Sequence, residues 1–125
     1  MRVLRREASV VLLVLAVGIL TSCFFPEPPA PAAKLEILDW SLQENDNMFM
    51  PRVITGHAKN VSGKTLSYVQ LDGKFYDAQN VLLASWMDNM NDLPAGVTWE
   101  FNIYLMDSDV ADRVHHATVE IGSCW

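Results

Sequence analysis

From residue 34 onward, large apolar residues and polar residues alternate with a period of two. Residues 97–106 show this most clearly, with Val, Trp, Phe, Ile and Leu at the odd positions and mostly polar or amphipathic residues at the even ones. Successive side chains on a β-strand point to opposite faces, so the pattern predicts a strand with one buried face. The same reasoning predicts further strands at 35–42, 52–59, 66–77, 81–87 and 114–121.

Turn-forming residues separate these stretches at 60–64, 77–80 and 93–96, and residues 107–112 are compatible with one helical turn. Short strands at this spacing predict an all-β domain over 34–125. We expect an antiparallel, immunoglobulin-like β-sandwich of about six to seven strands, without the Cys…Trp…Cys arrangement of antibody domains.

The first 22 residues have a different pattern. A short cationic segment with Arg2, Arg5 and Arg6 precedes an uncharged stretch, residues 8–20, made mostly of Val, Leu, Ile and Ala. That length suits the apolar core of a signal peptide and is short for a spanning helix, which needs about 20 residues. We therefore expect residues 1–22 to be a cleaved signal peptide; a spanning anchor extended to Phe25 is the alternative.

Leu20-Thr21-Ser22-Cys23 ends this segment and resembles the prokaryotic lipobox. The resemblance implies that Cys23 carries a diacylglyceryl thioether and becomes the mature N-terminus. The protein would then be lipid-anchored in the cell envelope, on the extracytoplasmic side of a membrane. The alternative is a plain signal peptide with an incidental cysteine. Residues 23–33 hold four prolines, typical of an extended, semi-rigid linker.

The net charge of the chain bears on which kinds of partner it can bind. The formal charge is −6, and without residues 1–22 Lys+Arg falls from 9 to 6 and Asp+Glu from 15 to 14, which gives −8. An acidic domain repels phosphates, so we expect no nucleic-acid partner.

Cys124 has no disulfide partner if Cys23 carries lipid, and we expect it to be a packed small residue, with intermolecular pairing or redox sensing as alternatives.

Three stretches between Val53 and Ile103 resemble the FxLYD family of small immunoglobulin-like domains. Residues 54–65 resemble its Gly-x-Val-x-Asn strand and hairpin, and Lys74-Phe75-Tyr76-Asp77 stands where the family has x-Leu-Tyr-Asp. Residues 93–96, which lead to Trp99-Glu100-Phe101, resemble its Pro-Gly turn. The resemblance implies a sandwich fold and an envelope setting, and it implies no enzyme activity.

The match departs from the family where Gly73 replaces the motif's Phe and Phe75 replaces its Leu. We expect Trp86 or Trp99 to fill the space beside Gly73. Three of the motif positions also have physical interpretations. Gly56 permits a close backbone approach or a bulge, and Asn60 and Gly63 suit a turn with left-handed backbone. Asp77 is placed to bond the amides of the turn that follows it.

The candidate metal ligands are two histidines and two polar clusters. Adjacent residues on a strand face opposite ways, so we expect His115 and His116 to be one exposed and one half-buried imidazole rather than a chelating pair. Two oxygen-rich runs have the side-chain types that bind calcium, although both fit solvated turns better. We expect no metal site, no cofactor and no catalytic residues. The two runs are Asp107, Ser108, Asp109 and Asp112, and Asp88, Asn89, Asn91 and Asp92.

Exposed aromatic and methionine side chains are the candidates for a binding surface. We expect the four tryptophans to pack mainly in the core of the sandwich. Trp40 and Trp125 lie near the ends of the domain, where they could be exposed and contribute to a binding surface. Met48, Phe49 and Met50 stand in a loop before Pro51 and could form an apolar patch. Asn60-Val61-Ser62 is formally a glycosylation sequon, and we interpret it as a turn. The tryptophans are Trp40, Trp86, Trp99 and Trp125.

The function expected from these features is non-catalytic. We expect a membrane-anchored envelope lipoprotein whose sandwich binds a protein or another envelope component through a sheet edge or a loop patch. The alternative is a lipoprotein that binds a solute or metal ion for a transporter or sensor. A small envelope hydrolase is a third, weaker hypothesis.

Overall fold

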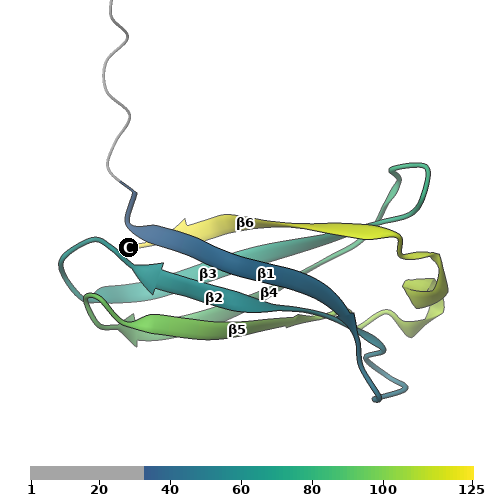
Figure 1. Ribbon diagram of the computed structural model, residues 1–125, viewed down its shortest axis with the longest axis horizontal. Helices are drawn as coiled ribbons and strands as arrows, with labels where there is room; N and C mark the ends of the chain where they lie inside the picture. Colours follow the sequence, from purple (N-terminus) through teal and green to yellow (C-terminus); the bar gives the residue numbers. More distant parts are fainter. Residues whose placement is uncertain (1–32) are drawn as a thin grey trace, which may run out of the picture. The chain divides into compact units, whose positions relative to one another are not determined.

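The computed structural model describes residues 33–125; the signal segment 1–22, Cys23 and the linker up to residue 32 lie outside this part. Six strands and one 3-10 helix follow one another in the described chain (Figure 1). They are β1 Leu35–Glu44, β2 Arg52–Asn60, β3 Leu66–Tyr76, β4 Leu82–Leu93, β5 Thr98–Tyr104, η1 Ser108–Arg113 and β6 His116–Cys124.

The strands form two three-stranded antiparallel sheets, in the orders β1-β2-β5 and β4-β3-β6. The sequential neighbours β2 and β3 are the central strands of the two different sheets. Pairing the fifth strand with the second, and the sixth with the third, is the connectivity of an immunoglobulin-like sandwich with few strands. The predicted all-β antiparallel sandwich is therefore confirmed, and the described chain has six strands.

The core lies between the two sheets and is built from the residues that alternate inward. On β3, Val69, Leu71 and Phe75 are fully buried, and on β5 the same holds for Phe101 and Ile103. Each such side chain contributes roughly 1.5–3 kcal/mol when it leaves water. The period of two in the sequence therefore identified the buried faces of these strands correctly.

Two glycines let the packed layers approach each other. A Cβ on Gly73 would lie 2.8 Å from Ile54 Cδ1 and 2.9 Å from Ile103 Cγ2, so isoleucines of the opposite sheet occupy the space beside it. The expectation that Trp86 or Trp99 fills this space is wrong. A Cβ on Gly56 would collide with the Asp39 carbonyl oxygen and would lie 2.8 Å from Phe101 Cζ, which confirms the predicted close approach.

The prediction of a polar loop over Asp88, Asn89, Asn91 and Asp92 is wrong, because β4 continues to Leu93. This strand lies at the edge of its sheet, where polar side chains remain in water. The Asp88 carboxylate binds two backbone amides at this edge. Oδ1 accepts from the Asn89 amide at 2.9 Å, and Oδ2 accepts from the Asn102 amide of β5 at 2.9 Å. A carboxylate that caps edge amides discourages unwanted strand pairing.

Of the four tryptophans, which we expected to pack mainly in the core, only Trp99 does so. Trp99 is 5% exposed, whereas Trp86, Trp40 and Trp125 are 36%, 39% and 61% exposed. Trp40 and Trp86 lie on edge strands, where the opposite sheet covers them only in part, and Trp125 follows β6 and stacks on Tyr68 at 4.7 Å between ring centroids.

Within residues 33–125, no helix has the length and apolar character needed to cross a membrane.

Candidate interaction surface

The turns and loops of the sandwich gather at two opposite ends. The first, which we call the proximal end, holds the start of β1 at Leu35, the β2–β3 turn and the β4–β5 turn. The second, which we call the distal end, holds the loops 45–51, 77–81 and 105–115. The longest strand, β4, has 12 residues and measures about 40 Å at 3.3 Å per residue, so the two ends are well separated.

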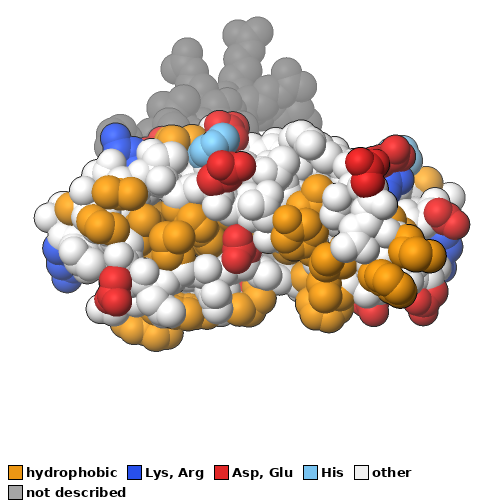
Figure 2. Space-filling view, turned by 90° about the horizontal axis from the view of Figure 1, so that it is seen from below, with side chains coloured by type: hydrophobic (Ala, Val, Ile, Leu, Met, Phe, Trp, Pro, Cys, Tyr) orange, Lys and Arg blue, Asp and Glu red, His pale blue; other side chains and the backbone are white. Residues whose placement is uncertain are grey.

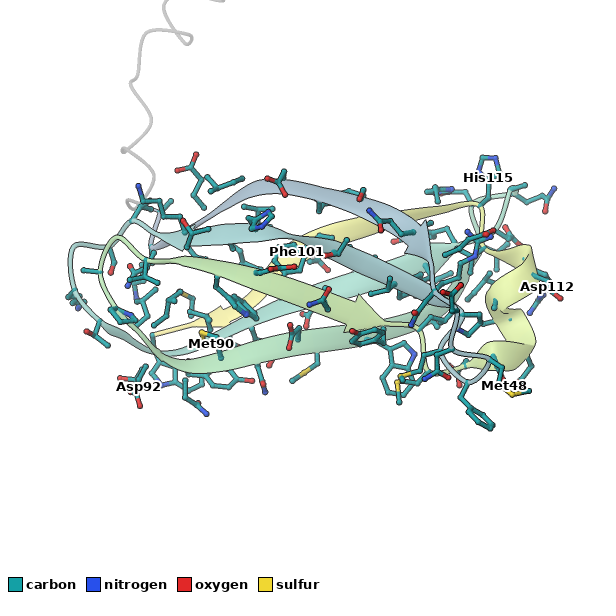
Figure 3. All side chains as sticks on the ribbon, turned by 60° about the horizontal axis from the view of Figure 1, so that its bottom comes forward. Met48, Met90, Asp92, Phe101, Asp112 and His115 are labelled. Atoms are coloured by element: carbon teal, nitrogen blue, oxygen red, sulfur yellow. The ribbon has the colours of Figure 1, made fainter. Side chains whose placement is uncertain are left out.

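Figure 3 shows this separation directly. Met48, Asp112 and His115 lie at the distal end of the sandwich, and Asp92 lies at the proximal end. Any surface that the distal loops form is therefore remote from the point where the described chain begins.

The 45–51 loop at the distal end is held in shape by its own hydrogen bonds. The Asn45 amide donates to Pro51 O at 2.9 Å, and its side-chain Nδ2 donates to Met50 O at 3.0 Å. Asn47 Oδ1 accepts from the Phe49 amide at 2.9 Å, and Asn47 O accepts from the Met50 amide at 3.1 Å. Asparagine side chains of this kind replace backbone partners in tight turns. The loop is thus preorganised although it projects from the sheet.

This ordered loop exposes two large apolar side chains. Met48 is 76% exposed and Phe49 is 71% exposed, the highest values among the large hydrophobic residues that the structure describes. Figure 2 shows apolar side chains along much of this face, including a group at the right-hand end with acidic side chains around it. Contiguous exposed apolar surface of this kind marks contact sites. The other exposed apolar residues at this end are Val81, Leu82, Tyr104 and Met106.

The two ends also differ in charge. The distal end has six acidic residues and two arginines, a formal charge of −4 with neutral histidines, whereas the proximal end has three lysines and two acidic residues, a charge of +1. The distal groups are Glu44, Asp46, Arg52, Asp77, Asp107, Asp109, Asp112 and Arg113; the proximal ones are Lys34, Glu36, Lys59, Lys64 and Asp92.

Asn60 closes the proximal end. Its fully buried side chain donates from Nδ2 to Lys64 O at 2.7 Å and to Leu93 O at 2.8 Å, and its Oδ1 accepts from the Ser62 amide at 3.0 Å and from Ser62 Oγ at 2.7 Å. The Gly96 amide donates to Asn60 O at 2.9 Å. One asparagine therefore ties both turns of this end together.

These contacts decide two predictions about the β2–β3 turn. Gly63 has the left-handed backbone that we expected, with φ of 81°, but Asn60 is not among the residues with positive φ, so that part of the expectation is wrong. Both amide hydrogens of Asn60 are engaged inside the protein, which favours the interpretation of the sequon as a turn. The expected role of Asp77 is confirmed, because its Oδ1 accepts from the amides of Gln79 and Val81, each at 2.9 Å.

The two candidate histidines remain in contact with each other, since the His115 and His116 rings meet edge to face with centroids 5.8 Å apart. His115 is exposed and precedes β6, whereas His116 is half-buried, stacks on Tyr76 at 5.1 Å and lies with Nε2 3.0 Å from Asn80 Oδ1. The predicted helical turn is present as η1. Asp107, Asp109 and Asp112 lie in or beside it, and within residues 33–125 no three His, Cys, Asp or Glu side chains are grouped as a metal site requires.

Two ion pairs lie on open outer faces of the sheets. His57 Nδ1 is 2.8 Å from Asp39 Oδ1, and this hydrogen bond together with the carboxylate charge raises the pKa of His57. Lys74 Nζ is 2.6 Å from Glu120 Oε1, and the bond to Glu120 raises the pKa of Lys74. Both pairs are exposed to water, where an ion pair contributes little to stability and has no enclosed cleft in which to act on a substrate.

Cys124 is a free, half-buried thiol that packs against the core beside Val69. Burial raises its pKa. A raised pKa lowers the thiolate fraction and thus the reactivity, which agrees with the expectation of a packed small residue.

Sequence reasoning identified Met48 and Phe49 as a possible patch but missed other residues of the distal end. The sequence assigns Tyr104 and Met106 to the polar or amphipathic face of a strand and Val81 to the first position of another. Their common signal is position: each is an apolar residue at a strand end, beside a predicted loop. The strand pairing is needed to place these residues at the same end as Met48; it puts Leu105 beside Arg52 through an amide–carbonyl bond of 3.0 Å.

Comparison with known proteins gives one relative of this chain. An uncharacterized protein of Methanocaldococcus jannaschii is 31% identical over 72 residues, which are 58% of this chain and 53% of the relative. The chain thus aligns with about half the length of this relative. No protein-family model matches the chain, and no solved structure matches it.

Proposed function

We propose that this protein is a lipoprotein of the cell envelope, anchored through lipid on Cys23, whose β-sandwich is a non-catalytic binding domain. The proposal for the anchor depends on the order of three features: a cationic segment, an apolar stretch of signal-peptide length, and Leu20-Thr21-Ser22-Cys23. The proline-rich segment that follows is suited to hold a domain away from a lipid surface.

The observation that carries the binding role is the 45–51 loop. Its four internal hydrogen bonds fix a conformation in which Met48 and Phe49 are mostly exposed. Transfer of such side chains from water into a partner gains roughly 1.5–3 kcal/mol each, before the cost of association. A preordered loop keeps that cost low. Binding of another envelope protein through this loop is therefore the function that the geometry favours.

The alternative of a solute- or metal-binding lipoprotein has less support. The histidines and the acidic residues of η1 do not converge within the described domain, and the closest acid–base pairs lie on open sheet faces. Binding of a small ligand usually requires an enclosed, mostly apolar site with convergent polar groups.

We also propose membership of the FxLYD family, on the residues that resemble it. The Asn60 side chain donates to Leu93 O, the Gly96 amide donates to the Asn60 carbonyl oxygen, and Phe75 is fully buried. These positions thus have structural roles that a shared fold would preserve. Aligned homologues in which residues 60, 75–77 and 94–96 vary freely would count against membership.

The anchor is tested by intact mass and membrane fractionation of the full-length protein. The native chain is expected in the membrane fraction, beginning at Cys23 and carrying acyl mass. Cys23→Ala is expected to abolish the acyl mass and the processing. Cys124→Ala, the matched control at the other cysteine, should leave both unchanged. A native chain without added mass, or one that retains residues 1–22, would refute the anchor.

A further inference from the structure

We infer that the distal end docks onto a protein surface in which an apolar pocket is bordered by lysine or arginine side chains. This inference rests on the binding role proposed above and specifies the chemistry of the partner. It depends on the position of the exposed apolar loop at the acidic end of the domain, where the formal charge is −4 against +1 at the proximal end.

The apolar part of the surface requires a pocket. Met48 and Phe49 are adjacent and project from a loop that Asn45 and Asn47 hold rigid. Two neighbouring side chains on a narrow, ordered loop fit a concave site better than a flat one. Tyr104 and Met106 lie at the same end and widen the apolar contact at its base.

The acidic border selects among the possible occupants. Six carboxylates and two arginines give the distal end a formal charge of −4. A second copy docked end to end would bring two such acidic surfaces together, and an anionic lipid surface would also be repelled. A cationic border on the partner instead gives electrostatic complementarity, which speeds encounter and excludes wrong partners.

The position of the loop in the fold agrees with this choice. The described chain enters the sandwich beside Leu35, at the end opposite the loop, and that end carries Lys34, Lys59 and Lys64. A domain attached there presents its basic end toward the attachment point and its acidic, apolar end away from it. Anionic head groups near the attachment point would favour the same orientation.

The test uses the full-length protein in its own membrane, with photoreactive p-benzoylphenylalanine in place of Phe49. The same residue in place of Val97, which is 42% exposed in the proximal β4–β5 turn, is the matched control. After irradiation, the adduct is digested and the attached segment is identified by mass spectrometry. We expect a discrete protein adduct from position 49 only, with lysine or arginine within a few residues of the attached apolar residue.

Charge variants in the photoreactive background test the acidic border. Asp46→Asn with Asp109→Asn is expected to lower the adduct yield about threefold at low salt, and the difference should vanish near 0.5 M salt. Asp92→Asn at the proximal end should change nothing.

An adduct with lipid, with a second copy of this chain, or with a segment lacking basic residues would each overturn the inference. So would the absence of an adduct, or a yield that is insensitive to the distal charges. Membrane retention of the same samples reports separately on the Cys23 anchor, so a failure of docking and a failure of the proposed anchor are distinguishable.

Discussion

The two ends of the sandwich use the same side chain, asparagine, for opposite purposes. At the proximal end Asn60 is fully buried, and its amide joins the β2–β3 turn to the β4–β5 turn. At the distal end Asn45 and Asn47 lie within one loop, and their bonds hold Met48 and Phe49 in water. Hydrogen bonds thus close one end and keep apolar surface open at the other.

This difference separates stability from recognition within one small domain. A bond that connects distant segments restricts the whole fold, because its loss frees both turns. A bond within a seven-residue loop restricts only that loop. Substitutions at the proximal end should therefore change the free energy of unfolding, and those at the distal end should change binding while the fold remains intact.

The largest effect is expected from Asn60→Ala. The substitution leaves the buried Leu93 carbonyl without its partner, which costs about 1–3 kcal/mol. It also removes the bonds of Asn60 to the partly buried Ser62 amide and to the Lys64 carbonyl, which keeps its bond from Ser62 Oγ. We expect a loss of more than about 2 kcal/mol in the free energy of unfolding, measured by urea denaturation. A loss below about 0.5 kcal/mol would contradict the role assigned to Asn60.

Asn45→Ala is the matched change at the distal end. It removes the bond from Nδ2 to Met50 O, a local and partly exposed contact. We expect a loss of about 1 kcal/mol or less, together with faster hydrogen exchange confined to residues 45–51. An effect as large as that of Asn60→Ala would show that the two ends do not differ in the way described.

The third prediction concerns the pKa of His57, which lies between the two ends on the outer face of the β1-β2-β5 sheet. Because the hydrogen bond and charge of Asp39 raise the pKa of His57 above its ordinary 6.5, the pair stabilises the fold fully below that value. The contribution is lost as the pH rises through the raised pKa of the folded state. NMR titration should give a midpoint above 6.5, and Asp39→Asn should return it toward that value.

The Glu100 charge also raises the pKa of His57, but less than Asp39 does. Glu100→Gln is therefore the control, with a smaller downward change in the midpoint. An unchanged midpoint in Asp39→Asn would refute the pairing.

The regular part of this fold could be predicted from the sequence because alternation reports directly on burial. The stretches around Phe75 and Phe101 have clear inner and outer faces, and both strands are present as predicted. Residues 88–92 were assigned to a loop because an edge strand need not be apolar on either face. Asp88 in particular looks like a turn residue until its two amide partners, on different strands, are known.

The candidate surface was predictable only in part. Met48 and Phe49 stand out because they precede Pro51 in a polar stretch, but the sequence left open whether they pack against the domain. The role of Asn60 was harder to foresee, since its partner Leu93 is 33 positions away. Contacts of that kind depend on which strands become neighbours, and a local pattern does not contain this information.

The smallest effect on stability is expected from replacing Met48 and Phe49 together by serine. Both side chains are more than two-thirds exposed, so their removal deletes little buried contact, and the free energy of unfolding should change by less than about 0.5 kcal/mol. Leu93→Ala is the control, because this fully packed side chain should cost about 2–5 kcal/mol. Urea denaturation measures both. A loss above about 1 kcal/mol for the double variant would mean that the pair supports the fold, and the distal end would then lose its distinction from the proximal one.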